Sequence, residues 1–137
     1  ETIIEIFLKK VNDFQGAIVA QPFVKEVSDG EYRAIYFDGV EIGTIIKKPK
    51  KGEFLANIAQ GAEFEKKELP SKLKEQCDQI AKDLYEDGTR FLAFDVLGEG
   101  VNEVNITCPG LLVEVSYACK KNLCFTIFDA IESKQLS

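Results

Sequence analysis

The sequence predicts an α+β domain in which an antiparallel sheet packs against helices. Two stretches have the pattern of β-hairpins: 31–46, which turns at Asp38-Gly39, and 91–107, which turns around Gly98. An Asp-Gly pair between two apolar strands is among the strongest local hairpin signals. Two further stretches, 3–11 and 70–86, carry apolar residues at helical spacing. Hairpins place strands side by side in antiparallel order. Together with the two helical stretches, they predict a sheet backed by helices.

The first helix is expected from its apolar stripe of Ile3, Ile4, Phe7, Leu8 and Val11. Residues 17–24 are then expected to form a strand that lies at a sheet edge, because proline cannot donate to a strand ladder. The hairpin 31–46 comes next. Residues 47–63 lose all periodicity and are expected to form a long loop, a feature that inside compact domains is usually functional or disordered.

A second helix is expected over 70–86, ending at Asp87-Gly88, and the second hairpin covers 91–107. Residues 122–137 are expected to form a closing helix. Neither an internal repeat nor a low-complexity linker interrupts the chain. The whole of 1–137 is therefore expected to be a single domain.

Composition excludes several classes of function. The 137 residues are 45% apolar and 29% charged with a net charge of −6, which disfavours a nucleic-acid partner. Apolar runs are far too short to cross a membrane. Histidine is absent and the four cysteines form no C-x-x-C pair, so zinc binding and histidine catalysis are not expected. Free thiols suit a reducing cytoplasm. Because methionine is also absent, we expect the chain to be part of a longer protein.

Three oxygen-bearing side chains are predicted to converge on the second hairpin. If its turn is 98–100, Leu97 pairs with Val101 and Asp95 lies opposite Glu103. Asn105 follows two residues later on the same face. Oxygen ligands of this kind favour a divalent cation such as Mg²⁺. The alternative at this point is a pair of half-exposed acids beside a turn.

Cationic residues form two further candidates. Lys47, Lys48, Lys50 and Lys51 crowd together in an acidic chain, and they form either a solvated turn or a flap that closes over an anion such as phosphate. Arg33, in the strand after the expected edge strand, suits phosphate or carboxylate by its fork geometry. The alternative for Arg33 is a surface position beside ordinary core packing.

The order of these motifs resembles a known family. The chain is similar, over about residues 17 to 132, to the C-terminal lobe of the ATP-grasp domain of bacterial-type (prokaryotic) glutathione synthetase. The motifs that carry this resemblance are, in order, Gln21-Pro22-Phe23-Val24, Asp29 to Arg33, Asp38-Gly39-Val40, Lys47 to Gly61, Phe94-Asp95-Val96 and Glu103 to Pro109.

The resemblance implies a role for each matching residue. It places the adenine base at the hinge 21–24 and ATP phosphates near the other positions, and it implies ATP and Mg²⁺, with Mn²⁺ as a substitute, as cofactors. Lys47 stands where the family has an arginine. The implied residues are Gln21, Pro22, Phe23, Val24, Glu31 and Asn57 for the nucleotide, Arg33 and Lys47 for catalysis, and Asp95, Glu103 and Asn105 for the metal.

The resemblance also implies an activity. A glutathione synthetase uses ATP to form an acyl phosphate on γ-glutamylcysteine, which the amine of glycine then attacks. A cytoplasmic, homo-oligomeric parent protein is implied, with no membrane or nucleic-acid partner. In this family the lysines that reach the phosphates lie upstream of the hinge, so the chain alone is expected to be inactive.

The chain departs from the family pattern at substrate-facing positions. Family arginines are replaced by Leu55 and Val113, a glycine by Ala56, and a threonine by Gly110. The alternatives are therefore another ATP-grasp ligase with a different acid substrate, or a nucleotide-binding module without catalysis. The expected metal ligands argue against the latter, because clustered acids are costly to keep without a function.

Overall fold

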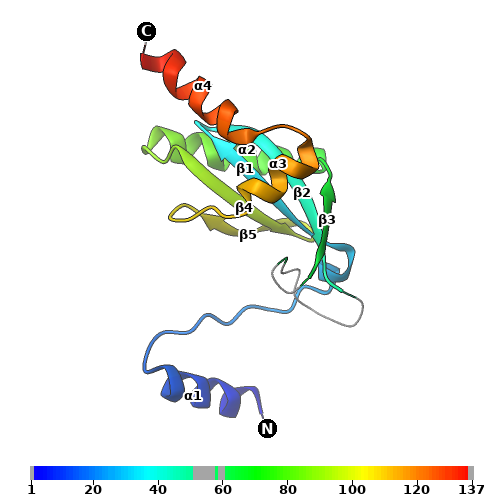
Figure 1. The fold of residues 1–137 in the computed structure, drawn as a ribbon. Coiled ribbons are helices and arrows are strands. Elements are labelled where there is room, and N and C mark those ends of the chain that lie inside the picture. The colour runs from blue at the N-terminus through cyan, green and yellow to red at the C-terminus, as the bar shows by residue number, and fades with distance from the viewer. Residues whose placement is uncertain (1, 51–57, 59–60, 136–137) are drawn as a thin grey trace.

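A five-stranded antiparallel sheet forms the middle layer of the computed structural model (Figure 1), which describes residues 2–50, 58 and 61–135. The strands lie in the order β3-β2-β1-β4-β5, and every neighbouring pair is antiparallel. This confirms the predicted α+β class. Their bounds are β1 Glu31–Phe37, β2 Val40–Lys48, β3 Glu63–Lys66, β4 Phe91–Leu97 and β5 Gly100–Asn105.

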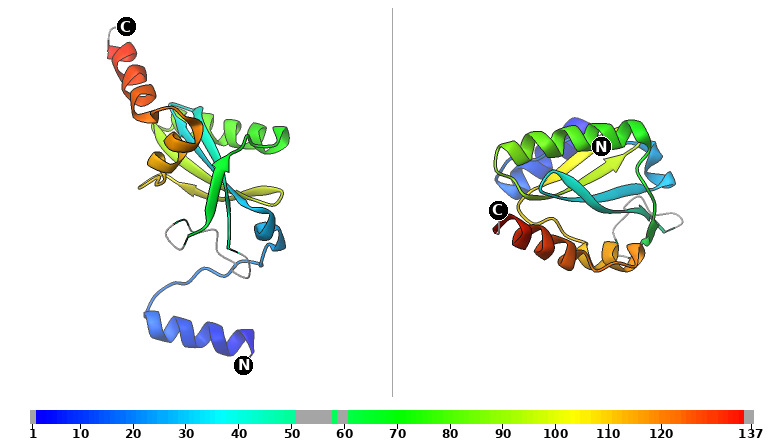
Figure 2. Two further views of the ribbon diagram at one scale, coloured as in Figure 1. Left: turned by 45° about the vertical axis from the view of Figure 1, so that its right-hand side comes forward. Right: turned by 90° about the horizontal axis from the view of Figure 1, so that it is seen from above.

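Helices cover both faces of this sheet. α2, Ser71–Glu86, lies on one face, and α3, Leu112–Cys119, with α4, Leu123–Gln135, lies on the other (Figure 2). Because side chains alternate along a strand, the central strands feed two separate cores. Tyr36 and Phe94 pack under α2, whereas Ile35 and Ile45 pack under α3 and α4. The central strands are therefore buried on both sides.

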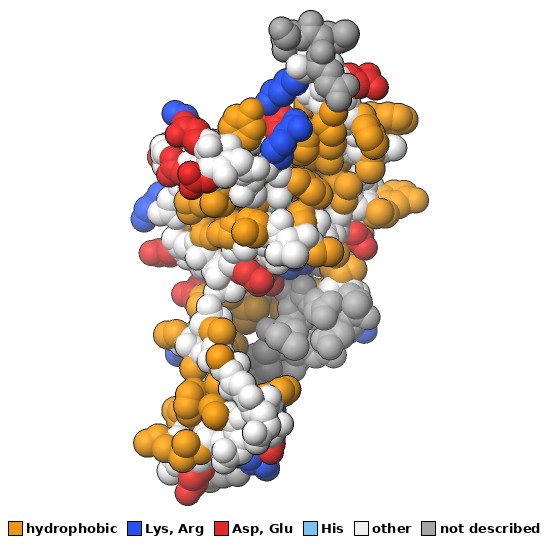
Figure 3. Space-filling model, turned by 90° about the vertical axis from the view of Figure 1, so that its left-hand side faces the viewer, with side chains coloured by type: hydrophobic (Ala, Val, Ile, Leu, Met, Phe, Trp, Pro, Cys, Tyr) orange, Lys and Arg blue, Asp and Glu red, His pale blue; other side chains and the backbone are white. Residues whose placement is uncertain are grey.

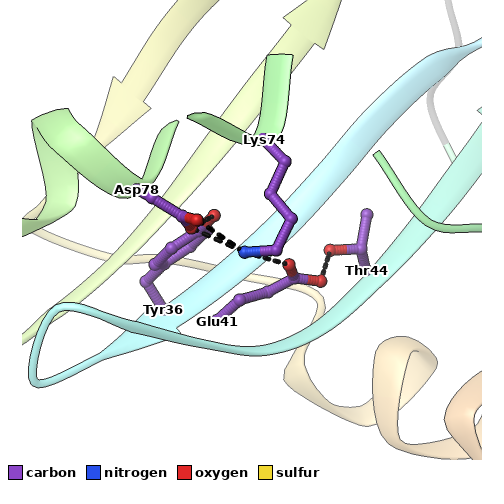
Figure 4. Close-up of polar contacts among 5 residues, drawn as sticks. All are labelled: Tyr36, Glu41, Thr44, Lys74 and Asp78. Atoms are coloured by element: carbon purple, nitrogen blue, oxygen red, sulfur yellow. Dashed lines mark hydrogen bonds and ion pairs between the residues drawn. The ribbon is translucent and has the colours of Figure 1, made fainter. Parts of the chain in front are cut away.

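A polar network joins α2 to the sheet (Figure 4). The buried Tyr36 hydroxyl donates to Asp78 Oδ1 at 2.7 Å. Lys74 Nζ lies between two acids, 2.7 Å from Asp78 Oδ2 and 3.4 Å from Glu41 Oε2, and Thr44 donates to the other Glu41 oxygen. Burial raises the pKa of Tyr36 far above its ordinary value, and its hydrogen bond to Asp78 adds to the rise. The network thus holds a neutral phenol against a paired carboxylate.

The helices α3 and α4 approach β2 closely at Gly43. A Cβ added there would lie 2.8 Å from Val115 Cγ1 and 3.1 Å from Leu123 Cδ1. The first distance is shorter than carbon atoms tolerate and the second is tight, so the absence of a side chain at this position lets both helices pack on the strand.

The first helix stands apart from this body. α1, Ile3–Phe14, begins with a capping box between Thr2 and Glu5, yet it buries none of its residues. Figure 1 shows α1 separated from the sheet by an extended segment. Figure 3 shows hydrophobic side chains on its surface as well as on the main body. Those exposed by more than 40% in α1 are Ile3, Ile4, Ile6, Phe7, Leu8 and Phe14.

Residues 17–24 do not form the expected strand. The structure gives this stretch no regular element, and a short 3₁₀ helix η1, Lys25–Asp29, follows it. A strand needs a partner, and no described strand pairs with 17–24. Pro22 also lacks the N–H that a ladder would use. The apolar content of the stretch is therefore not sufficient to make it a strand within this chain.

The loop after the first hairpin is shorter than expected. Lys47 and Lys48 complete β2 and Glu63 begins β3, so 49–62 connects the two strands. Asn57, Leu55 and Lys51 lie outside the described residues. No helix in the described part of the chain is both long and apolar enough to span a membrane.

Candidate functional site

Four charged side chains meet on one face of the sheet. It is the face that α3 and α4 cover at another part of the same strands. We call Glu31, Arg33, Lys47 and Asp95 the charged cluster. Arg33 lies directly opposite Asp95 across β1 and β4, and Glu31 lies opposite Lys47 across β1 and β2. The two-residue period of strands continues this face from Ile35 and Ile45, which belong to the core under α3 and α4. The cluster is thus an extension of that core in which charges replace apolar side chains.

Asp95 is the centre of the cluster. Its Oδ1 lies 3.1 Å from Lys47 Nζ and 3.3 Å from Arg33 Nε. Its Oδ2 accepts from Asn105 Nδ2 at 3.1 Å. Lys47 also reaches Glu31, with 3.4 Å between Nζ and Oε2. Both oxygens of Asp95 are therefore held by groups of the chain itself.

The charges of the cluster are buried. Exposed fractions of the side chains are 6% for Asp95, 7% for Lys47, 12% for Arg33 and 18% for Glu31. Buried ions need partners, since desolvation costs several kcal/mol per ion. Burial raises the pKa of Glu31 above its ordinary value; Lys47 opposes the rise and Asp95 adds to it. Two carboxylates thus share the charge of one lysine.

Arg33 has spare hydrogen-bonding capacity. Its Nε and Nη1 are buried and have no hydrogen-bond partner among the described residues, although Nε lies within ion-pair distance of Asp95. A guanidinium normally forms several directed hydrogen bonds when it is buried. Unsatisfied donors of this kind suit an additional anion, and they favour the anion-binding interpretation of Arg33 over a simple surface position.

The second hairpin places Glu103 opposite Asp95 as predicted, but by a different route. Leu97 pairs with Gly100 rather than with Val101, so the turn has two residues and not three. The ladder then shifts between Asp95 and Val96, which leaves Asn102 as the extra residue of a β-bulge. The bulge restores the register, so Glu103 still lies opposite Asp95.

The three predicted metal ligands fit a hard cation by chemistry. Asp95, Glu103 and Asn105 share a face and offer only oxygen ligands. Glu103 is exposed, whereas Asn105 turns its amide nitrogen toward Asp95. In the described residues no group of three or more acidic, cysteine or histidine side chains is close enough to hold a metal. A cation here would therefore bind through a rearranged Asp95 and Asn105.

The residues expected at the adenine base lie outside the charged cluster. Gln21, Pro22 and Phe23 are exposed and Val24 is half-buried. Val24 nevertheless contacts the second hairpin, because a Cβ added to Gly98 would lie 3.2 Å from its Cγ1. Gly98 has a φ of +61° and suits this approach. The end of the expected hinge therefore meets the turn of the expected metal hairpin.

Lys47 is the residue whose place sequence reasoning missed. The lysine run predicted either a solvated turn or a flap, yet Lys47 is a buried strand residue, and its exposed neighbour Lys48 pairs with Glu65 at 3.2 Å. A signal was available: Gly43, Ile45 and Lys47 continue the same two-residue period of β2. A charged residue at the end of such a series lies on the core face, and it needs a buried partner.

Comparison with solved structures supports the fold. The D-alanine–D-alanine ligase from Bacillus anthracis, solved in complex with ATP, matches with a TM-score of 0.56 at 19% sequence identity. The match covers 92% of this chain and 45% of the ligase. At this identity the likeness concerns the fold alone, and it agrees with an ATP-grasp C-terminal subdomain.

Comparison with curated sequences finds glutathione synthetases. That of Prochlorococcus marinus subsp. pastoris is 33% identical over 106 residues, which cover 77% of this chain and 34% of the relative. That of Pseudomonas syringae pv. tomato is 33% identical over 118 residues, 85% of this chain and 37% of the relative. The chain thus spans about a third of the length of these relatives. A profile of the family described as "Prokaryotic glutathione synthetase, ATP-grasp domain" matches residues 1–120. The chain belongs to the ATP-grasp domain family of prokaryotic glutathione synthetase.

Proposed function

We propose that this chain is the C-terminal lobe of an ATP- and Mg²⁺-dependent carboxylate–amine ligase and that it acts within a longer parent protein. The observation that carries the proposal is the charged cluster beside Glu103. Arg33 offers buried donors with no hydrogen-bond partner among the described residues, and Asp95 and Glu103 offer opposed carboxylates. Membership of the ATP-grasp domain family indicates the reaction in which these residues would act.

The residues of the lobe have distinct tasks in this proposal. Arg33 and Lys47 neutralise negative charge on the transferred phosphoryl group and on the acyl phosphate. Asp95, Glu103 and Asn105 hold Mg²⁺, which supplies Lewis-acid charge neutralisation when bound. The backbone of Gln21 to Val24 contacts the adenine base, Glu31 lies near the nucleotide, and Asn57, which lies outside the described residues, is assigned to the nucleotide by the family pattern.

The proposed substrates are γ-glutamylcysteine and glycine. The carboxylate of γ-glutamylcysteine attacks the γ-phosphorus of ATP, which gives an acyl phosphate and ADP. The glycine amine then attacks the acyl carbon, loses a proton, and releases phosphate as the amide bond forms. No side chain of the lobe forms a covalent bond to the substrate; the lobe positions and neutralises. A cytoplasmic, homo-oligomeric parent is part of the proposal.

A second candidate is an ATP-grasp ligase with a different acid substrate. Val113, which replaces a family arginine, is 64% exposed at the start of α3. It lines a hollow of about 610 Å³ together with Tyr117, Lys120 and Lys121. An apolar residue in place of a cation favours a less acidic substrate than γ-glutamylcysteine.

Phosphate release by the full-length parent separates the two candidates. With ATP, Mg²⁺, γ-glutamylcysteine and glycine, we expect release that requires both amino substrates. Omission of each substrate in turn is the control. Release only with other pairs of acid and amine would favour the second candidate, and no acid-dependent release with any pair would contradict both.

A further inference from the structure

We propose that Lys47 is an exchangeable counter-ion, which holds Asp95 until a divalent cation displaces it. The inference rests on the proposed function, because it concerns the metal site assigned there. It adds a sequence of binding events to the site. The cation and Lys47 compete for the carboxylate of Asp95, and the displaced lysine then becomes available to a phosphate.

Lys47 and a divalent cation compete for Oδ1 of Asp95. Lys47 Nζ lies 3.1 Å from this oxygen, and Asn105 holds the other oxygen from a distance of 3.1 Å. A divalent cation binds carboxylate oxygens at about 2.0–2.6 Å. A cation and an ammonium group cannot share one oxygen at such distances without strong repulsion. Lys47 must therefore withdraw when the cation binds.

Lys47 has a place to remain in the site after it leaves Asp95. It is paired with Glu31 as well as with Asp95, so loss of one partner leaves the other. Its flexible stem can swing by a few ångström without unfolding the strand. Arg33 Nε also lies 3.3 Å from the same oxygen of Asp95, but among the described residues Arg33 has no second carboxylate to hold it once it is displaced.

The displacement of Lys47 has a consequence for ligand binding. Once displaced from Asp95, Lys47 keeps only Glu31, whose side chain is more exposed (18%) than that of Asp95 (6%), so its ammonium group lies nearer to solvent and can pair with an anion. A polyphosphate that attracts Lys47 would in turn free Asp95 for the cation. Binding of cation and phosphate is then mutually favourable, and by linkage the two effects are equal in size. The cation alone is expected to bind weakly.

Chemical labelling of the wild-type parent tests the exchange directly. Lysines are acetylated briefly without and with Mn²⁺, and the peptides are quantified by mass spectrometry. Lys47, whose side chain is 7% exposed, should react slowly without Mn²⁺ and several-fold faster with it. Lys48, 48% exposed and next in sequence, is the matched control and should not respond. In Asp95→Asn the response of Lys47 should disappear.

Mn²⁺ binding without nucleotide gives an independent measure. Removal of one positive charge beside Asp95 should make Lys47→Met bind Mn²⁺ about tenfold more tightly than wild type. Lys48→Met should bind as wild type does. Labelling of the wild type keeps the test valid if Lys47→Met does not fold.

The outcomes separate this inference from the proposed function. Mn²⁺ binding that requires Asp95, with Lys47 still protected from acetylation, would overturn the counter-ion and leave the metal site intact. Mn²⁺ binding that is unchanged or weaker in Lys47→Met would also overturn the counter-ion and leave the metal site intact. Absence of any Asp95-dependent Mn²⁺ binding would overturn the metal site and the counter-ion together.

Discussion

At Asp95 of β4, one carboxylate is shared by groups from three other strands of the sheet. Lys47 reaches it from β2, Arg33 from β1 and Asn105 from β5. A substitution at Asp95 therefore changes several contacts at once, and its effect on a ligand is hard to separate from its effect on the fold. Glu103 is a cleaner probe, because it is exposed and lies opposite Asp95 without joining the ion pairs of the cluster.

Glu103→Gln should weaken metal binding by roughly 10- to 100-fold, because a neutral amide replaces a charged ligand. The measurement is titration of the full-length parent with Mn²⁺ in the presence of ADP, together with ligase turnover. Glu99→Gln, in the turn of the same hairpin, removes an equal charge and should leave both unchanged. Equal affinities of wild type and Glu103→Gln would remove Glu103 from the metal site.

Tyr36→Phe should destabilise the fold by about 1–2 kcal/mol, because it removes a hydrogen bond to a charged acceptor. The lost contact is the 2.7 Å bond from the Tyr36 hydroxyl to Asp78, and Lys74 keeps that acid paired. Urea denaturation followed by circular dichroism measures the change. Tyr117→Phe, whose ring is 75% exposed, is the control and should change stability little. A neutral effect of Tyr36→Phe would mean that the bond from Tyr36 to Asp78 in Figure 4 contributes no net stability.

Among the elements, the β1–β2 hairpin is tied to its neighbours at its turn. Asp38 has a left-handed φ of +51° and forms two hydrogen bonds with Arg90, at 2.7 and 2.9 Å. Lys134 of α4 lies 2.9 Å from the same carboxylate. The hydrogen bonds from Arg90 lower the pKa of Asp38 below its ordinary value, and Lys134 lowers it further.

This pairing predicts a pH dependence of stability. A lowered pKa means that the ionised acid stabilises the fold above the unfolded pKa of about 3.9, and that this contribution is lost as the pH falls through the lower folded pKa. Asp38→Asn should therefore be less stable than wild type at pH 7, and the difference should shrink as the pH falls from about 4 through the lower folded pKa. Asparagine tolerates the left-handed turn, so the backbone is preserved.

Thermal unfolding of both proteins across this pH range measures the effect. Asp129→Asn removes an exposed acid from α4 and serves as the control for charge. A stability difference between wild type and Asp38→Asn that stays constant down to pH 2 would contradict the ionic origin of the effect.

Gly43→Ala should destabilise the packing of α3 and α4 on β2 by about 1–3 kcal/mol, because its Cβ would meet Val115 and Leu123. Gly110→Ala is the matched control, since a Cβ there has no atom within 4 Å. Urea denaturation compares the two variants. If both behaved alike, the close approach of the helices to β2 would not limit the size of residue 43.

Sequence reasoning recovered the elements whose signals are local. The two helices at 3–14 and 71–86 and both hairpins were predicted, because helical spacing and the Asp38-Gly39 turn are read within a few residues. Residues 17–24 were mispredicted, because an apolar run becomes a strand only if it finds a partner elsewhere. The Asp95–Glu103 pair was right although the turn was wrong, since the bulge compensated for the shorter turn.

At the scale of the whole molecule, α1 and the segment after it contribute little to the body around the sheet. α1 buries no residue, and hydrophobic side chains such as Val19 and Phe23 are exposed by 85% and 64%. The chain also spans about a third of the length of the relatives, 34% and 37% in two cases. Both facts support the proposal made above that the chain acts as one lobe of a longer parent protein.

Residues 1–137 on their own should therefore show no ATP hydrolysis and no ligation. The physical reason is that a lobe which offers one side of a nucleotide site cannot exclude water or align the substrates. Phosphate release under the same conditions from the isolated chain and from the full-length parent is the comparison. Turnover by the isolated chain that is lost in Glu103→Gln would show that the site is complete within it.

The β-bulge at Asn102 gives the second hairpin a tolerance for changes of length. Without a bulge, the two-residue turn would set Asn102 opposite Asp95 and direct Glu103 and Asn105 to the α2 face. If Asn102 were deleted, Asp95 and Glu103 would remain opposite each other. The same would hold if one residue were inserted in the turn and the bulge closed. Insertions and deletions among homologous sequences should therefore collect between 98 and 102. Between 103 and 105 a single added residue would put the two polar side chains on opposite sides of the sheet, so that stretch should keep a constant length.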